Sequence, residues 1–436
     1  MMPKLNTGII QSWRSVPCGG CGRRKGECDE GPTGKRRERG LYIRRQDKIL
    51  VMVFKRILHP VGQGAFVTEQ FLDENGTSVL NVVYDCGEMR STKHLDREIE
   101  NTLNPTGNAE VVDVLFISHL DEDHISGIDH LINIGGLTDK SVVILPFNYP
   151  LVIKVLLLAD RYFFRGQFST GVTDILFRLF ATGAKILGID NNTEAIINSD
   201  ATLENLRNMN DGSVVKSLQP LRFKNLWYYI PFNTILDDDR YVKFVDALRN
   251  AKISKSQLTD ATYVQKHMNE LIDIYRNLPK GIGNVTAINV NSLNVFSYSA
   301  NNIEYRGEWF NYFGVDARYL GTCYDYLLYR SRCSCLYTGD CVMEPRFEHC
   351  MDLLVSHISS YIGMLQIPHH GRQGNYNAKI ASKNEILSGF TNFNSTYKAN
   401  KFVKRIVQDF SMSGRMFFQI TEHFHSRMEL YVHLCV

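Results

Sequence analysis

Residues 111–124 read VVDVLFISHLDEDH and join an apolar run directly to a group of ligand side chains. The run ends at Ser118 and is nearly all apolar, which predicts a strand buried on both faces. Four side chains that can bind a metal follow within six residues: His119, Asp121, Asp123 and His124. Imidazole nitrogen and carboxylate oxygen both suit divalent first-row metals. The stretch therefore predicts a metal site where the strand ends; the alternative is a solvated acidic turn with two incidental histidines.

Three other segments place a polar residue between an apolar run and a turn. They are residues 84–87 (YDCG), 337–340 (YTGD) and 367–371 (IPHHG). They contribute Asp85, Asp340 and the adjacent pair His369 and His370. Because each segment offers a ligand type at the end of a strand, together they strengthen the prediction of a metal centre built from several strands.

The order of the predicted elements indicates an α/β layered sandwich. Besides 111–118, strands are expected over residues 53–58, 65–72, 79–84, 142–145, 287–298, 335–338, 364–367 and 416–421. Helical spacing is expected over 125–134 and recurs between 151 and 280, with a possible strand at 226–230. We predict four parts: a basic, disordered N-terminal extension (1–51), a first half of the sandwich (52–150), a mostly helical insertion (151–280) and a second half (281–436).

Composition and charge exclude several classes of protein. The chain has 436 residues, 44% hydrophobic and 22% charged, which is ordinary for a globular protein. No apolar run approaches the ~20 residues that span a bilayer, and no secretory pattern opens the chain, so we expect a cytoplasmic protein without membrane contact. Ten cysteines in this length do not make a disulfide scaffold. Residues 1–50 carry 12 basic and 5 acidic residues, whereas the remainder carries 37 and 41.

Four motifs in this order resemble the metallo-β-lactamase superfamily. They are Asp-Cys-Gly at 85–87, His-x-Asp-x-Asp-His at 119–124, Thr-Gly-Asp at 338–340 and Pro-His-His-Gly at 368–371. The chain resembles in particular the soluble hydrolase domain of ComEC-type competence proteins and their free-standing relatives. The resemblance covers roughly residues 56–147 and 284–424 and leaves the basic N-terminus and the predicted insertion unexplained.

The resemblance implies a fold and a set of roles. The fold would be an αββα sandwich with one or two divalent ions, zinc or manganese, at one edge. His119 and Asp121 would bind one ion, and Asp123 and His124 the other. Asp340 would bridge the ions, and Asp85 would hold the ligand loop. Either His369 or His370 would complete the coordination.

The sequence departs from the superfamily pattern in two places that concern the metals. Asp121 stands where many members have a second histidine, which favours manganese, or tolerance of several metals, over strict zinc. Many relatives also have a ligand histidine before the bridging aspartate, but here only His130 and His267 lie between His124 and Asp340. Both fit a structural role better, so the ion at His119 and Asp121 would be weakly held or absent.

The predicted function is a metal-dependent hydrolase that cleaves phosphodiesters, as a nuclease or phosphodiesterase, with metal-activated water. Asp123 would be the catalytic residue, orienting or deprotonating that water as well as binding metal. DNA is one expected substrate, although the net negative body argues against duplex binding. The alternatives are a hydrolase of another small ester, lactone or phosphorylated substrate, and a metal-binding partner subunit in a multi-protein system.

Overall fold

The computed structural model describes residues 51–435, with gaps. The longest gaps are 147–174, 235–245, 275–291 and 313–332. Shorter ones are 90–91, 176–177, 191–193, several between 255 and 273, 301–303, 359–360 and 396–399. Of the predicted N-terminal extension (1–51), residues 1–50 lie outside the described residues and Val51 begins the first strand; the predicted boundaries of the four parts stay predictions. No helix of the described part is both long and apolar enough to cross a membrane.

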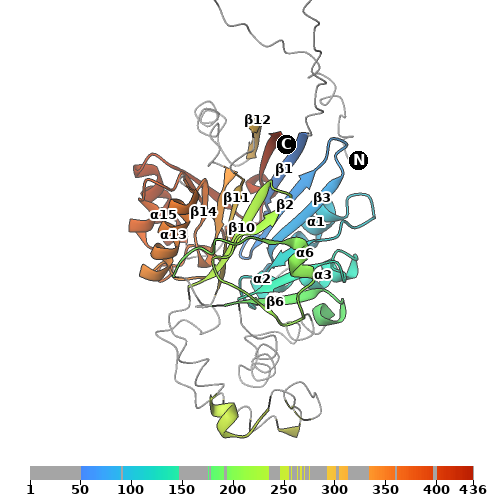
Figure 1. Ribbon diagram of the computed structural model, residues 1–436. Helices are drawn as coiled ribbons and strands as arrows, with labels where there is room; N and C mark the ends of the chain where they lie inside the picture. Colours follow the sequence, from blue (N-terminus) through green and yellow to red (C-terminus); the bar gives the residue numbers. More distant parts are fainter. Residues whose placement is uncertain are drawn as a thin grey trace, which may run out of the picture. The chain divides into compact units, whose positions relative to one another are not determined.

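The described chain is an α/β structure with two mixed sheets (Figure 1). The nine strands of the first sheet are, in spatial order, β12 (Glu304–Tyr312), β17 (Met428–Cys435), β1 (Val51–Leu58), β2 (Phe66–Leu72), β3 (Ser78–Cys86), β4 (Val114–Phe116), β5 (Val142–Leu145), β6 (Lys185–Ile189) and β8 (Val214–Val215). The pairs from β12 to β3 are antiparallel, and those from β3 to β8 are parallel.

The second sheet has eight strands and a similar division. In spatial order they are β16 (Met416–Ile420), β15 (Ser388–Asn392), β14 (Met364–Gln366), β13 (Cys335–Tyr337), β11 (Leu293–Ser299), β10 (Trp227–Asn233), β9 (Leu221–Phe223) and β7 (Ala201–Thr202). The pairs from β16 to β13 are parallel. The pairs from β13 to β9 are antiparallel, and the last pair, β9 with β7, is again parallel.

Alternation of side chains along the strands produces three apolar layers. Successive residues of a strand point to opposite faces, so Val114 and Phe116 lie in the core shared by both sheets, whereas Leu115 lies in a second core. That second core includes residues of α1 (Thr92–Leu103) and α3 (Ile128–Asn133). A third core joins the second sheet to α13 (Pro345–Ile358) and α15 (Asn400–Met412). Helices outside both sheets, as Figure 1 shows, are consistent with a β-lactamase-like αββα sandwich.

A buried ion pair ties the two sheets together between their facing surfaces. Arg56 on β1 and Glu69 on β2 are 0% and 2% exposed, and Arg56 Nε donates to Glu69 Oε1 at 2.7 Å. Glu69 also accepts hydrogen bonds from the hydroxyls of Tyr229 and Tyr337 on the second sheet, each at 2.6 Å. Burying a charge is costly unless it is paired and hydrogen-bonded, so this network favours one alignment of the sheets.

The sequence predicted most of these strands correctly but misjudged the middle of the chain. Residues 185–233 form five strands of the two sheets and one short helix, α6 (Leu203–Arg207), so this part of the predicted helical insertion is strand-rich. The expected strand at 226–230 is confirmed as part of β10. The short strands 185–189 and 221–223 alternate too briefly to be separated from helical spacing. Much of the remaining 151–280 segment lies outside the described residues, and the described part shows no large helical insertion.

A buried histidine makes the fold sensitive to acid. His59 follows β1 and is fully buried, with Nδ1 2.8 Å from Glu98 Oε2 and Nε2 3.0 Å from Thr68 Oγ1. Burial lowers the pKa of His59 to about 4, against the opposing effect of Glu98. In the unfolded chain this imidazole regains a pKa of about 6.5, so the unfolded state gains protons first as the pH falls.

We predict that His59→Gln makes the free energy of unfolding less dependent on pH. Between pH 7.5 and pH 5 the free energy of unfolding should fall by about 2 kcal/mol more in the wild-type chain than in the variant. The reason is that His59 takes up a proton in the unfolded wild-type chain but stays neutral in the folded one. Urea unfolding of both chains in a metal chelator measures this difference. Equal losses in the two chains would contradict the assignment.

Candidate metal centre

The candidate centre lies where the parallel blocks of the two sheets end. In the first sheet, Asp85 is the second-last residue of β3, and His119 follows the neighbouring strand β4. In the second sheet, Asp340 follows β13, and His369 and His370 form a short turn, η5 (His369–Gly371), after β14. The carboxyl ends of parallel strands meet at one edge, so side chains distant in the sequence come together there.

Main-chain N–H groups fasten the loops of the site, one of them between the two sheets and two within the second sheet. The N–H of Leu293 on β11 donates to the carbonyl of Ser118 at 2.8 Å. The N–H of Asp340 donates to Ser292 Oγ at 3.0 Å, and the N–H of His369 donates to the carbonyl of Gly339 at 3.0 Å. One of these bonds thus connects the loop after β4 to the second sheet, and the other two hold the Asp340 and His369 segments to their neighbours within that sheet.

Two glycines allow these loops to approach closely. A Cβ on Gly87 would lie 2.3 Å from the carbonyl carbon of Asp123 and from the nitrogen of His124. A Cβ on Gly339 would lie 2.5 Å from the Cβ of Ser118, and its φ of +51° is in the left-handed region. Any side chain at either position would push the ligand loop away from its neighbours.

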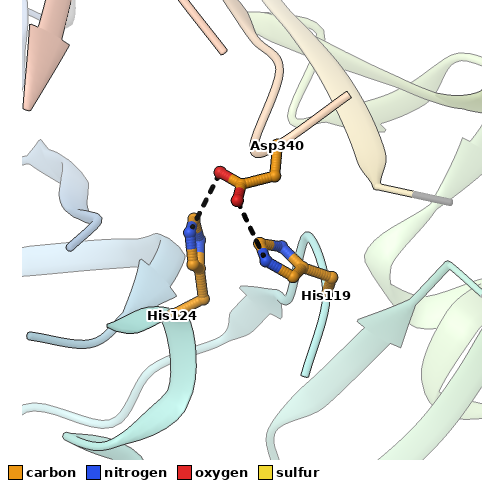
Figure 2. A group of neighbouring side chains, drawn as sticks. All are labelled: His119, His124 and Asp340. Carbon is orange, nitrogen blue, oxygen red and sulfur yellow. Dashed lines mark ion pairs between the residues drawn. The ribbon is translucent and has the colours of Figure 1, made fainter. Parts of the chain in front are cut away.

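Two overlapping groups of side chains bring their ligand atoms together. His119, His124 and Asp340 offer atoms that all lie within 4.8 Å of one another, and so do Asp123, His124 and His370. In Figure 2 the two imidazoles of the first group point toward the carboxylate of Asp340. Oδ1 of Asp340 is 3.3 Å from His124 Nε2, and its Oδ2 is 3.5 Å from His119 Nε2. Each group could hold a metal ion.

The second group and two side chains at the edge complete the cluster. His370 Nε2 lies 3.0 Å from Asp123 Oδ2, and His369 Nδ1 lies 3.2 Å from Asp340 Oδ2. Asp121 Oδ2 lies 3.5 Å from His119 Nε2. Asp121, His369 and His370 are 22%, 16% and 12% exposed, whereas the other members are almost wholly buried, so the cluster opens to solvent on their side.

Asp85 fixes which nitrogen carries the proton in two of the histidines. Its carboxylate accepts from the N–H of Ser118 at 2.6 Å and from the Ser118 hydroxyl at 2.7 Å, and it lies 2.8 Å from His124 Nδ1. A carboxylate only accepts, so Nδ1 of His124 carries the proton. The Ser118 hydroxyl gives its single proton to Asp85 and must therefore accept from His119 Nδ1, 2.9 Å away. In the neutral imidazole, the form that binds metal, Nε2 of each histidine therefore holds the lone pair.

The same reasoning separates His370 from His369. Nδ1 of His370 lies 2.9 Å from the carbonyl oxygen of Asn392 and donates to it, so Nε2 is the nitrogen that His370 presents to the cluster. Nε2 lies 3.0 Å from Asp123 Oδ2 and carries a proton toward this carboxylate, and a bound cation would replace that proton. In His369 it is Nε2 that lies 3.4 Å from Arg372 Nη1, which can only donate. Neutral His369 therefore carries its proton on Nδ1, the atom that faces Asp340.

The backbone is strained at this cluster. His369 and His370 have φ values of 50° and 52°, and Asp85 has 54°. Left-handed conformations cost roughly 1–2 kcal/mol per non-glycine residue and concentrate at functional sites. Here the turn places two consecutive imidazoles beside different carboxylates, Asp340 and Asp123.

The cluster carries excess negative charge that its own imidazoles offset. Burial raises the pKa of Asp340, but His369, His119 and His124 outweigh burial and hold it well below its usual value. Burial lowers the pKa of His124, yet Asp85 and Asp340 hold it well above its usual value. Burial also raises the pKa of Asp123, while His124 and His370 lower it to about 2. A cation among these carboxylates would meet the same attraction that holds these protons.

The structure gathers all the residues that the sequence nominated for the site. His119, Asp121, Asp123, His124, Asp340, His369, His370 and Asp85 lie in one cluster. The intervening histidines lie elsewhere: His130 pairs with Glu100 at 2.9 Å, and His267 pairs with Glu270 at 3.1 Å. Sequence reasoning missed Ser118, although it stands beside His119. It also missed Asn392, which acts through a main-chain carbonyl that no residue type reveals.

Comparisons with protein-family models and with curated proteins found no match to this chain. The chemistry that the site can support is therefore inferred from its own geometry.

We predict that Asp85→Asn weakens binding of divalent metal by about 10- to 100-fold, as loss of an outer hydrogen-bond partner does in other metal sites. The amide can turn an N–H toward His124 Nδ1, which no longer has a fixed acceptor. Calorimetric titration with Zn²⁺ measures the change. Asp211→Asn is the matched control, since Asp211 Oδ1 also accepts a main-chain N–H, that of Ile186 at 2.8 Å, but lies outside the cluster. Unchanged affinity in Asp85→Asn would contradict the role of Asp85.

Proposed function

We propose that the cluster holds one or two divalent cations, zinc or manganese, and that the chain is a hydrolase of phosphodiesters. One observation carries the metal proposal. Five buried nitrogen and oxygen atoms of the cluster have no hydrogen-bond partner among the described residues: His119 Nε2, His124 Nε2, His369 Nδ1, Asp121 Oδ1 and Asp340 Oδ1. Buried polar atoms nearly always have a hydrogen-bond partner. A divalent cation is a partner that imidazole nitrogens and carboxylate oxygens can bind together.

The donor set fits such ions. Three imidazole Nε2 atoms, from His119, His124 and His370, stand beside the carboxylates of Asp123 and Asp340. This mixture of nitrogen and oxygen suits zinc, and its carboxylates also suit manganese. We propose that Asp340 is shared, since its two oxygens face different imidazoles. His119 with Asp121 would form one side, and Asp123, His124 and His370 the other.

The hydrolase proposal rests on the chemistry that a bound cation supplies and on the open side of the cluster, where a substrate can reach it. When bound, a divalent cation lowers the pKa of water toward neutrality and polarises an ester or phosphoryl oxygen. The open side, at Asp121, His369 and His370, lets a substrate approach the ligand atoms. Asp123, at this cluster, would orient the attacking water as well as bind the cation. The choice of a phosphodiester is supported by the sequence resemblance to ComEC-type hydrolase domains, and DNA is one candidate substrate.

We predict that the purified chain with Mn²⁺ or Zn²⁺ hydrolyses bis-(p-nitrophenyl) phosphate. Asp123→Asn and His124→Ala should each lower kcat/KM by about a thousandfold or more, because loss of a metal ligand removes both the activated water and the polarised oxygen. Asp211→Asn should keep wild-type activity. Parallel assays with single- and double-stranded DNA test the substrate. Full activity in either ligand variant would contradict the proposal.

The two adjacent histidines should respond differently to substitution. His370→Ala should lose bound metal, since His370 forms one ligand group with Asp123 and His124, whereas His369→Ala should keep it, since His369 belongs to neither ligand group. Metal content by mass spectrometry after gel filtration decides between them. Equal metal loss in both variants, or loss in His369→Ala alone, would reverse the assignment.

A further inference from the structure

We infer that Arg372 holds the anionic group of the substrate and so makes the centre selective for phosphate esters over neutral esters. This inference rests on the proposed hydrolase function and concerns its specificity. Within two residues of the six proposed ligands, His119, Asp121, Asp123, His124, Asp340 and His370, the sequence carries four acidic side chains and a single basic one, Arg372. An anionic substrate must approach this acidic group, and a fixed cation at its rim would offset the repulsion.

The backbone places Arg372 firmly beside the cluster. Its N–H donates to the carbonyl of His369 at 2.9 Å, and its own carbonyl accepts from the N–H of Asn375 at 3.0 Å. Asn375 is 1% exposed, and its side-chain amide donates to the carbonyls of Asp340 and Cys341 at 2.9 and 3.0 Å. The loop that carries Arg372 is therefore attached at both ends to the ligand-bearing segments.

The side chain of Arg372 is available to a ligand. It is exposed, and its Nη1 lies 3.4 Å from His369 Nε2 on the side where the cluster opens to solvent. No ion pair joins Arg372 to any carboxylate of the described residues, unlike Arg178, Arg207 and Arg427, which pair with Asp129, Asp113 and Glu98. A guanidinium has five donors in a planar fork that matches the oxygens of a phosphate.

The position of the guanidinium indicates its role. It lies beside Nε2 of His369, and Nδ1 of the same imidazole lies 3.2 Å from Asp340 Oδ2. The imidazole of His369 therefore stands between the guanidinium and the carboxylate of Asp340. It is therefore a substrate-binding group and not a ligand of the metal. A neutral ester offers no charge to this fork, so we expect Arg372 to matter only for anionic substrates.

The test compares an anionic and a neutral substrate in the metal-loaded full chain. For bis-(p-nitrophenyl) phosphate, Arg372→Ala should lower kcat/KM roughly 10- to 100-fold, mainly through KM, as loss of a charge-assisted hydrogen bond does. Arg372→Lys should recover part of this loss, because it keeps the charge but not the fork. For p-nitrophenyl acetate, all variants should match the wild type within about twofold. Metal content should not change.

Controls separate this inference from the function on which it rests. Arg222→Ala is the matched control, because Arg222 on β9 lies outside the cluster and contacts Asp200 at 3.6 Å. Three results for Arg372→Ala would overturn the inference. They are a kcat/KM for the diester equal to that of Arg222→Ala, an equal loss of activity on both substrates, and a loss of bound metal. A wild-type chain that cleaves neither substrate contradicts the hydrolase proposal instead. Arg372 is then judged by calorimetry with inorganic phosphate, where equal affinity in wild type and Arg372→Ala would overturn its role.

Discussion

The buried carboxylate of Asp85 is the interaction on which the arrangement of the site depends. It accepts the N–H and the hydroxyl of Ser118 and lies 2.8 Å from Nδ1 of His124. Through Ser118 it also determines the proton position on His119. One carboxylate at the end of β3 thus orders the loop that follows β4 and directs two Nε2 atoms toward Asp340. In a protein core such an anion is stable only when its hydrogen bonds are complete, so carboxylate and loop require each other.

The features of the structure that oppose folding lie in the same cluster. Three non-glycine residues of the cluster have left-handed backbone conformations, and several buried nitrogen and oxygen atoms have no hydrogen-bond partner among the described residues. Strain and incomplete pairing of this kind oppose folding and are maintained by the surrounding structure. Here the support comes from two sandwiched sheets with the Arg56 and Glu69 pair between them. The rigid framework allows ligand atoms to face one another in a way that loops alone would not sustain.

The sequence predicted which side chains meet in the cluster better than it predicted the middle of the fold. The segment 111–124 indicated both a buried strand and candidate ligands after it, because four ligand types directly after a continuous apolar run favour a cation site. Strands 185–189 and 221–223 were missed because their alternation is too short to distinguish from a helix and depends on long-range pairing. The choice between His369 and His370 was out of reach, since it depends on the carbonyl of Asn392 and the guanidinium of Arg372. Main-chain acceptors leave no trace in a pattern of side chains.

The most direct test of the metal centre is anomalous diffraction from crystals of the chain grown with Zn²⁺ or Mn²⁺. We expect density bonded to Nε2 of His124 and to Asp340, with His119 or His370 as a further ligand through Nε2. Nδ1 of His119, His124 and His370 should remain on Ser118, Asp85 and Asn392. Absence of metal at this cluster under saturating conditions, or coordination through any Nδ1 of these three histidines, would contradict the central claim.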